Sequence, residues 1–492
     1  MRSMLALLLA SASLSACTSM APKYARPEAP VPASWPVGDA YLKQSEAALP
    51  SISYRDIFRD DRLRRIVEQA LVNNRDLRVA AANIVAARAQ YRIQRADLLP
   101  QVDASAGVTR ADSGTGRTTT TGGSAASGGA RTTYSTDLGI TAFEIDLFGR
   151  VRSLTDAAQN RYFATEAAAR ATRLTLVGDI ANAWLNYAAD QSLLKIAQDT
   201  AASAERSVKL TKARLDGGVA PRTDLSQSQL VLAQAQSDLA VQTTALAQDV
   251  NLLQLLVGAP VDTALLPGTI DEAAKTVAEL PAGLDSGILL RRPDVLQAEY
   301  GLRASNAEIG AARAALFPRI SLTAVLGFAS NALSGLFTGG AFNYSVAPGA
   351  SYPIFSAGAG RAGLEQSKAQ RDAALATYEK SIQTAFREVS DALARRGTIA
   401  AQTRAAQSLA AAASDNYRLS DARYRGGIDT FLQSLDAQRS LYTAQRSLVA
   451  TQLTGATNLV DLYRTLGGDA QLDATARGPV PAGAPAGTPP SN

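Results

Sequence analysis

Two segments of the chain alternate apolar and polar residues, which is the period of a β-strand with two different faces. In residues 319–355, for example, Ile320, Leu322 and Ala324 lie on one face; residues 101–146 alternate in the same way on both sides of a Gly/Ser/Thr-rich loop. Each arm is about ten residues long, which suits a strand that crosses a bilayer as well as a half-buried strand of a soluble hairpin. The pattern predicts two β-hairpins and leaves their surroundings open.

Very long helices are predicted after each hairpin. Proline is absent from residues 150–216 and 360–425, which are rich in the strong helix formers Ala, Leu, Gln, Arg and Glu. About 65 helical residues form a rod of roughly 100 Å, which fits a coiled coil or a helical barrel rather than a globular domain. Both rods end at a Gly-Gly pair, and we expect the first glycine, Gly217 or Gly426, to take the positive φ that stops the helix.

The chain is an internal duplication, because the same landmarks recur in the same order about 209 to 218 residues apart. Asp76-Leu77 recurs as Asp294-Val295, and the segment Arg214–Val219 recurs as Arg423–Ile428. The first repeat, residues 76–284, is predicted to hold a helix, the hairpin 101–146, the long helix 150–216 and the helix 223–256. The second, residues 285–468, is predicted to hold the helix 294–317, the hairpin 319–355, the long helix 360–425 and the helix 430–466. We expect residues 17–75 to form a lipidated N-terminal extension with an equatorial segment, and residues 469–492 to form a disordered tail.

Residues 1–16 have the pattern of a lipoprotein signal peptide. Arg2 precedes an apolar stretch from Met4 to Leu14 that is too short to span a bilayer. The stretch runs into Leu14-Ser15-Ala16-Cys17, a lipobox in which small residues fit the protease and the Cys17 thiol carries the diacylglyceryl group. With palmitate or a similar chain on the freed amine, two or three acyl chains give durable anchoring. The alternative is a secretory signal that ends beside a cysteine by chance.

Composition excludes most enzyme classes. The 492 residues contain no histidine, and Cys17 is the only cysteine. Ser–His and Cys–His nucleophiles, histidine-ligated metals and intramolecular disulfides are therefore excluded. Carboxylate or Ser–Lys chemistry stays open, but no constellation of residues points to it. The net charge of +5 is small, and no basic stripe interleaved with aromatic residues indicates a nucleic-acid partner. We therefore expect no catalysis, no cofactor and no metal.

Four strands are too few to close a membrane barrel, because the smallest such barrels have about eight. An open sheet edge in lipid would leave backbone groups without hydrogen-bond partners. If the hairpins span a membrane, the protein must therefore oligomerise. Three copies would supply about twelve strands and about twelve helical columns.

The ordered set of motifs resembles the TolC-like outer-membrane factor family, in its lipoprotein branch, over about Tyr24 to Gly468. The lipobox, the paired hairpins and three segments carry the resemblance: Asp146-Leu147-Phe148-Gly149-Arg150, Arg291-Arg292-Pro293-Asp294 and Leu435-Asp436-Ala437-Gln438-Arg439. The resemblance implies a mainly α fold with a transmembrane β portion: a homotrimeric 12-stranded β-barrel, four strands per chain, continuous with a 12-helix periplasmic α-barrel. Such a protein is the outer-membrane exit duct of a resistance-nodulation-division type tripartite efflux pump.

The resemblance also implies partners and a location. A periplasmic adaptor protein would link the duct to an inner-membrane efflux pump, and the duct would passively conduct drugs and other toxic small molecules across the outer membrane of a Gram-negative bacterium. Anchored in outer-membrane lipid through Cys17, the protein would extend into the periplasm. The alternatives are the outer duct of a type I protein-secretion or metal-efflux system, and a periplasmic coiled-coil tether without a pore.

The resemblance places a closed gate at the periplasmic helix tip, with Leu432, Asp436 and Arg439 at matching positions. Leu432 would form an apolar ring that resists wetting, and Asp436 a ring of carboxylates that attracts cations. Arg439 is on the same helical face as Asp436 and would hold it in an ion pair. From the residues alone, this is equally a plain surface pair worth a few tenths of a kcal/mol.

Other positions near the tip match or depart from the family pattern. Asp224 and Tyr424 match positions at which a bond between neighbouring helix pairs keeps the tip shut. Gln433 and Asp429 stand where some members have aspartate and arginine, so we expect a weaker acidic field and one missing latch.

The two turns are the expected adaptor-docking tips, Gly217-Gly218-Val219 and Gly426-Gly427-Ile428. A glycine tip lets a partner helical hairpin approach the backbone, and Val219 and Ile428 offer apolar contacts. Simple helix termination is the alternative explanation of these glycines.

Overall fold

The structure is a computed structural model that describes residues 19–36, 38, 41, 53–112, 130–279 and 286–482. The predicted signal peptide, Cys17, residues 113–129 of the first hairpin loop and residues 483–492 lie outside the described residues. The chain divides into two compact units, which are described separately below. The strand unit comprises residues 1–26, 85–162 and 300–376, and the helix unit comprises residues 27–84, 163–299 and 377–492.

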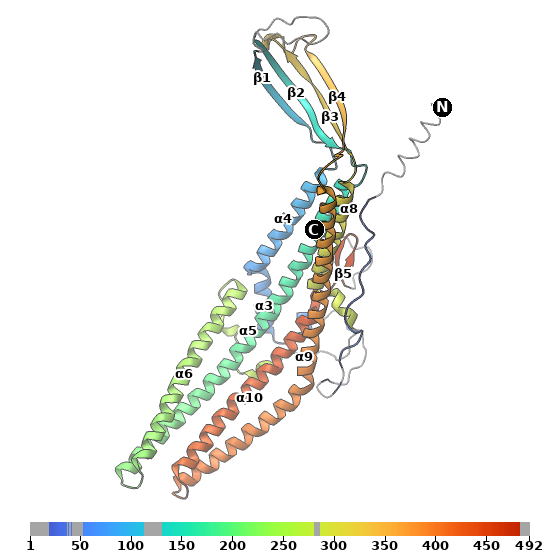
Figure 1. The fold of residues 1–492 in the computed structure, drawn as a ribbon. Coiled ribbons are helices and arrows are strands. Elements are labelled where there is room, and N and C mark those ends of the chain that lie inside the picture. Colours follow the sequence, from blue (N-terminus) through green and yellow to red (C-terminus); the bar gives the residue numbers. More distant parts are fainter. Residues whose placement is uncertain are drawn as a thin grey trace. The chain divides into compact units, whose positions relative to one another are not determined.

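Helices make up most of the described chain (Figure 1). The α-helices are α2 (Tyr54–Ile57), α3 (Asp61–Asn73), α4 (Arg75–Ala96), α5 (Arg150–Asp216), α6 (Arg222–Val257), α7 (Ile270–Ala274), α8 (Pro293–Ala314), α9 (Ala359–Arg425) and α10 (Phe431–Thr465). Short 3-10 turns are η1 (Thr263–Leu265), η2 (Ser286–Arg291), η3 (Leu333–Gly335) and η4 (Gly468–Ala470). The strands are β1 (Asp103–Ala111), β2 (Arg131–Glu144), β3 (Arg319–Ser330), β4 (Phe342–Ser351), β5 (Leu472–Thr475) and β6 (Gly478–Pro481). Across the described ranges, no helix combines the length and the apolar character that a membrane crossing requires.

The strand unit contains one antiparallel sheet, with strand order β1-β2-β3-β4. The central pair, β2 and β3, joins the two repeats, and Leu138 lies opposite Leu326. A register shift between Ile140 and Phe143 bends β2, as expected of a bulge. Among the described residues, β1 and β4 each pair with one strand only, and every residue of both edge strands is exposed. The sheet is therefore open at two edges.

An N-terminal segment is held against α8 in the strand unit. The Arg303 guanidinium lies 4.8 Å from the centre of the Tyr24 ring, and Asn306 donates to the Pro22 carbonyl at 2.7 Å. Arg313 donates to the Met20 carbonyl at 3.0 Å. Gly310 makes this close approach possible, because a Cβ at that position would lie 2.6 Å from the Ala21 nitrogen. The described chain closest to Cys17 is therefore fixed in place.

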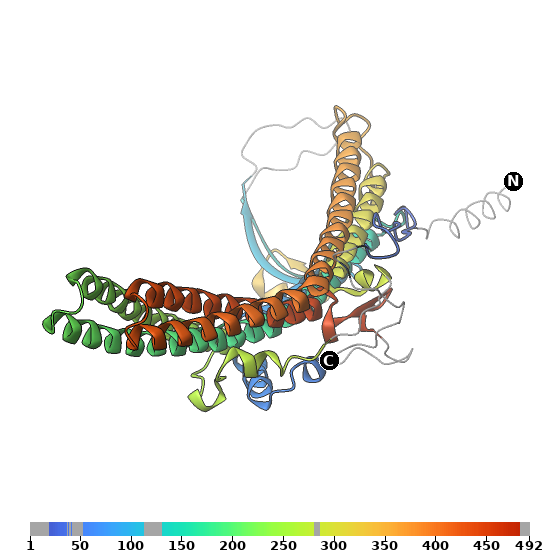
Figure 2. The same cartoon turned by 90° about the horizontal axis from the view of Figure 1, so that it is seen from below.

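The helix unit contains two helical hairpins, α5 with α6 and α9 with α10, which lie side by side in both views (Figures 1 and 2). Hydrogen bonds join the two hairpins: Ser203 to Tyr417 at 2.8 Å, and Tyr442 to Asp238 at 2.6 Å. Near the middle of α5, Trp184 is buried and its indole donates to the Leu265 carbonyl at 3.1 Å.

The duplication is visible where each second hairpin helix ends. Gly258 after α6 and Gly467 after α10 both adopt the left-handed conformation, with φ of 74° and 85°. Asn74 donates to the Leu256 carbonyl at 2.7 Å, and its counterpart Arg292 donates to the Thr465 carbonyl at 2.8 Å. In both halves of the chain, a terminal helix carbonyl is therefore satisfied by the side chain of a residue just before α4 or α8.

The predicted disorder of residues 469–492 is wrong as far as residue 482. Residues 468–482 form η4 and the two-stranded sheet of β5 and β6. Asp469 accepts hydrogen bonds from Tyr463 at 2.9 Å and Arg173 at 3.1 Å. Leu472 is fully buried, and Gly478 leaves room for the ring of Phe163, which lies 2.8 Å from where a Cβ would be. These contacts order a segment whose composition alone is typical of a tail.

Candidate functional site at the helix turns

The turn between α5 and α6 and the turn between α9 and α10 close with the same hydrogen bonds. In the first, Gly218 donates to the Leu215 carbonyl at 2.9 Å and Val219 to the Arg214 carbonyl at 2.9 Å. In the second, Gly427 donates to the Tyr424 carbonyl at 3.0 Å and Ile428 to the Arg423 carbonyl at 2.9 Å. This is the Schellman pattern of helix termination, in which the residue after the helix is left-handed.

The second glycine of each pair, not the first, takes the positive φ. Gly218 has φ of 75° and Gly427 has φ of 74°. Gly217 and Gly426 instead keep the helical bond to the residue four positions earlier, at 3.0 Å in both turns. The sequence-based assignment of positive φ to Gly217 and Gly426 is therefore wrong, because each helix continues for one more hydrogen bond than expected.

Both turns present an apolar side chain directly after the left-handed glycine. Val219 is 69% exposed and Ile428 is 67% exposed. Among the described residues, nothing lies within 4 Å of where a Cβ would be at Gly218 or Gly427. The structure therefore leaves the backbone at both tips open to a partner.

An ion pair that the sequence analysis missed closes the second turn. Two guanidinium nitrogens of Arg423, Nε and Nη2, donate to the Asp429 carboxylate at 2.5 and 2.9 Å. The Arg423 hydrogen bond lowers the pKa of Asp429. Asp429, the position of the predicted missing latch, has its ion-pair partner within its own turn. The repeated Arg-x-x-Gly-Gly motif contained the arginine but gave no indication of this partner.

Tyr424 is buried where the two hairpins meet, just above the turns. Its ring packs on Phe431 with centroids 5.3 Å apart, and Leu435 completes the apolar cluster. Arg214 of α5 places its guanidinium 4.9 Å from the ring centre and donates to the Tyr424 carbonyl at 3.1 Å. Burial raises the pKa of Tyr424, and the charge of Asp224 acts in the same direction. The Tyr424 hydroxyl has no hydrogen-bond partner among the described residues, so no bond to Asp224 forms within the chain. Arg214, which the sequence did not indicate as a site residue, contacts Tyr424 across the hairpins.

The residues that the sequence predicts to form a gate lie on the exposed face of α10 within one chain. Leu432 is 52% exposed. The Asp436 and Arg439 side chains are 65% and 60% exposed, and their closest charged atoms are 4.0 Å apart. Within the chain, this pair is a loose contact rather than a hydrogen-bonded latch.

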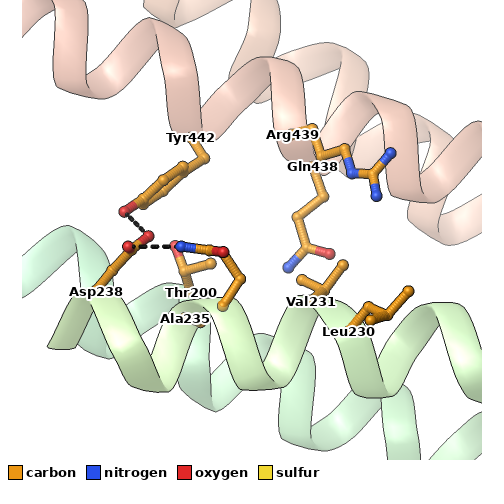
Figure 3. A pocket seen from close by; sticks show the side chains of 9 residues that line it. Thr200, Leu230, Val231, Ala235, Asp238, Gln438, Arg439 and Tyr442 are labelled. Carbon is orange, nitrogen blue, oxygen red and sulfur yellow. Dashed lines mark hydrogen bonds between the residues drawn. The ribbon is translucent and has the colours of Figure 1, made fainter. Parts of the chain in front are cut away.

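A cavity lies between α6 and α10, a few turns above the tips (Figure 3). At one end the Tyr442 hydroxyl donates to Asp238 at 2.6 Å, and Gln234 donates to the same carboxylate at 2.9 Å. Burial, followed by the hydrogen bond to Asp238, raises the pKa of Tyr442 to about 12. Tyr442 therefore remains a hydrogen-bond donor at neutral pH. The described part of the chain contains no cluster of acidic residues that could hold a metal ion.

A search of solved structures shows the class to which this fold belongs. The chain is similar to the open-state MtrE outer membrane channel of Neisseria gonorrhoeae, with a TM-score of 0.81 and 33% identity. The similarity covers 94% of this chain and 99% of that one. The fold is therefore that of an outer-membrane channel.

Sequence comparison shows the family. The outer membrane efflux protein family matches residues 66–259 and 285–468. The chain is 45% identical over 469 residues to the toluene efflux pump outer membrane protein TtgC of Pseudomonas putida, covering 95% of this chain and 96% of that protein. It is 41% identical to the outer membrane protein OprJ of Pseudomonas aeruginosa, covering 94% and 95%. The chain belongs to the outer membrane efflux protein family.

Proposed function

We propose that the protein is the outer-membrane exit duct of a tripartite efflux system and conducts small molecules passively. The observation that carries this proposal is the open sheet: within the described residues, β1 and β4 each have one strand partner. An open edge is not tolerated in lipid, where its backbone groups have no water to bond. The exit duct needs a closed barrel, and other copies of the chain would supply the missing partners.

The same reasoning supports a homotrimer. Three sheets of this kind give a barrel of about twelve strands, within the size range of bacterial outer-membrane barrels. The helical hairpins of three chains would form the periplasmic part of the tube. Lipid on Cys17 would anchor each chain in the outer membrane, and the fixed segment from Met20 to Tyr24 would hold the anchor against α8.

The gate is proposed to consist of Leu432 and Asp436 from each chain, with Arg439 as a weak partner of Asp436. The exposure of these side chains within one chain supports this assignment, because side chains that line a pore must lie on the surface of the protomer. A ring of carboxylates at a constriction attracts cations. Removing the ring should therefore change both conductance and ion selectivity.

Planar bilayer recording of the purified trimer tests the duct and its gate together. We expect the wild-type trimer to form a pore, and Asp436→Ala to raise its conductance and lower its preference for cations. Glu205→Ala removes an exposed carboxylate of α5 and should leave both quantities unchanged. No conductance from a verified trimer in either form would contradict the proposal and favour a periplasmic tether.

We further propose that the two turns dock a periplasmic adaptor, which connects the duct to an inner-membrane pump. Open backbone at Gly218 and Gly427, with Val219 and Ile428 beside it, supports this role. Gly218→Trp with Gly427→Trp should abolish efflux from cells while trimers still assemble. Gly339→Trp adds the same bulk at another open glycine and should preserve efflux, and unchanged efflux in the double variant would remove the docking role.

The relatives suggest a class of transported compounds. Relatives of this chain are named for the efflux of toluene and of antibiotics. We propose small apolar or amphipathic molecules as the cargo. Cells that lack the protein should become sensitive to toluene, and expression of the intact chain should restore growth.

A further inference from the structure

We propose that the cavity between α6 and α10 is a binding site for a small aromatic carboxylate of about the size of benzoate. The cavity has a volume of about 270 Å³. An apolar cavity of about 150 Å³ already admits benzene, so the space is sufficient for an aromatic ring with a carboxylate attached. All of its lining residues belong to the helix unit.

The apolar part of the lining comes from α6. Leu230, Val231 and Ala235 form one side of the cavity. Val231 and Ala235 share a helical face because they are four residues apart, and Leu230 directly precedes Val231. Figure 3 shows these residues on α6 below the side chains of α10. Such a surface suits the face of an aromatic ring.

A buried amide supplies the polar recognition. Gln438 of α10 is only 8% exposed, and its Nε2 has no hydrogen-bond acceptor among the described residues. In Figure 3 the Gln438 side chain extends from α10 toward α6 beside Val231. Buried donors in folded proteins are almost always paired, because leaving one unpaired is costly. The amide therefore indicates that an acceptor atom occupies the cavity.

The charges around the cavity favour an anionic acceptor at one end. Gln438 and Arg439 lie at one end, and Asp238 with its donor Tyr442 lies at the other (Figure 3). A carboxylate beside Gln438 would accept from its amide and face the Arg439 guanidinium, while the aromatic ring would separate it from Asp238. Charge-assisted hydrogen bonds of this kind are stronger than hydrogen bonds between neutral groups.

Binding would also affect the gate, a consequence that rests on the proposed function. The ligand would contact both hairpins, and it would therefore favour the arrangement in which α6 and α10 lie together. We expect it to lower conductance.

Isothermal titration of the intact trimer with sodium benzoate tests the site. Benzoate should bind in the millimolar range or tighter, and acetate, which lacks the ring, should not. Gln438→Leu removes the donor and should weaken binding about tenfold or more. Gln438→Glu, which keeps the shape of the side chain but replaces the donor with an acceptor, should abolish binding. Gln407→Leu changes an exposed glutamine of α9 and should bind benzoate as the wild type does.

The outcomes separate this inference from the proposed function. Equal affinity in the wild type and both Gln438 variants, or no heat with benzoate from a folded trimer, would overturn the site. Benzoate that lowers the bilayer conductance of the wild type but not of Gln438→Leu would support both the site and its effect on the gate. If benzoate binding depends on Gln438 but no form of the protein conducts, the binding site is supported and the proposed function as a duct is contradicted.

Discussion

At the residue scale, the difference between the two glycines of a turn is conformational. Gly427 has φ of 74° and open space around its missing Cβ. We expect Gly427→Ala to destabilise the protein by about 1–2 kcal/mol, because an L-residue is strained in the left-handed region. The melting temperature by circular dichroism should fall accordingly.

Gly426→Ala is the matched control for this change. Gly426 retains a helical hydrogen bond, and its added Cβ would lie 3.4 Å from the Ala422 carbonyl oxygen, an ordinary contact. Reduced freedom of the unfolded chain should make this variant neutral or slightly more stable. Equal melting temperatures for the two variants would contradict the assignment of the left-handed residue.

A second residue-scale prediction concerns pH. Burial, followed by the charge and hydrogen bond of Asp190, raises the pKa of Asp249 from 3.8 to about 7. Between about pH 4 and pH 7 the folded protein therefore holds more protons at this site than the unfolded chain, so this contribution to stability falls as pH rises through that window. The wild-type protein should gain stability at pH 5 relative to pH 8 from this group, and Asp249→Asn should reduce the difference in melting temperature.

Because Asp249 is only half-buried, the pH effect should be modest. Asp199→Asn removes an exposed carboxylate of α5 and should keep the pH dependence of the wild type. If Asp249→Asn and Asp199→Asn behave alike, the elevated pKa is wrong.

Much of the residue-level chemistry could not be predicted from the sequence. The Gly-Gly pairs correctly predicted the positions of both turns. Which glycine is left-handed depends on how far each helix continues, and the pairs do not show this. Arg214 stood in the repeated motif, yet its position over Tyr424 depends on how the two hairpins pack. Gln438 is part of a motif found in the sequence, but only the structure shows that its amide is buried and has no acceptor among the described residues.

At the element scale, the bond between Tyr442 and Asp238 should hold α6 and α10 together. Tyr442→Phe removes a 2.6 Å hydrogen bond to a carboxylate, which typically contributes about 1.5–3 kcal/mol. We expect faster amide hydrogen exchange in peptides from both helices. Tyr417→Phe, which breaks a neutral bond to Ser203 at 2.8 Å, should have a smaller effect, and unchanged exchange in Tyr442→Phe would show that the bond does not couple the helices.

The elements themselves were largely predictable, because their signals are long. A helix such as α5, with 67 residues, and strands with a regular period leave little ambiguity. The strands β5 and β6, with four residues each, are too short for any period to show. They form because Leu472 is buried and Gly478 fits against the ring of Phe163 in α5, contacts that no local pattern reveals.

At the scale of the whole molecule, the duplication is consistent with the proposal that one chain forms a third of a closed tube. Each repeat contributes a hairpin, and β2 pairs with β3 to join the hairpins through their inner strands. The outer strands β1 and β4, one from each repeat, remain at the edges. In an antiparallel barrel, β4 of one chain would pair with β1 of the next, and the number of copies is set by closure.

Cysteine cross-linking tests that closure. In a Cys17→Ser background, Ser105→Cys in β1 would be combined in turn with cysteines at positions 345 to 351 of β4. Oxidation should give covalent dimers and trimers, strongest at every second β4 position because side chains alternate between the two faces of a strand. Gly107→Cys with Ser135→Cys joins directly opposed residues of β1 and β2 and should form a bond within one chain and no oligomer. If no β4 position cross-links the purified protein, the edges do not meet between copies, and the barrel must be abandoned while the helical hairpins and their cavity remain.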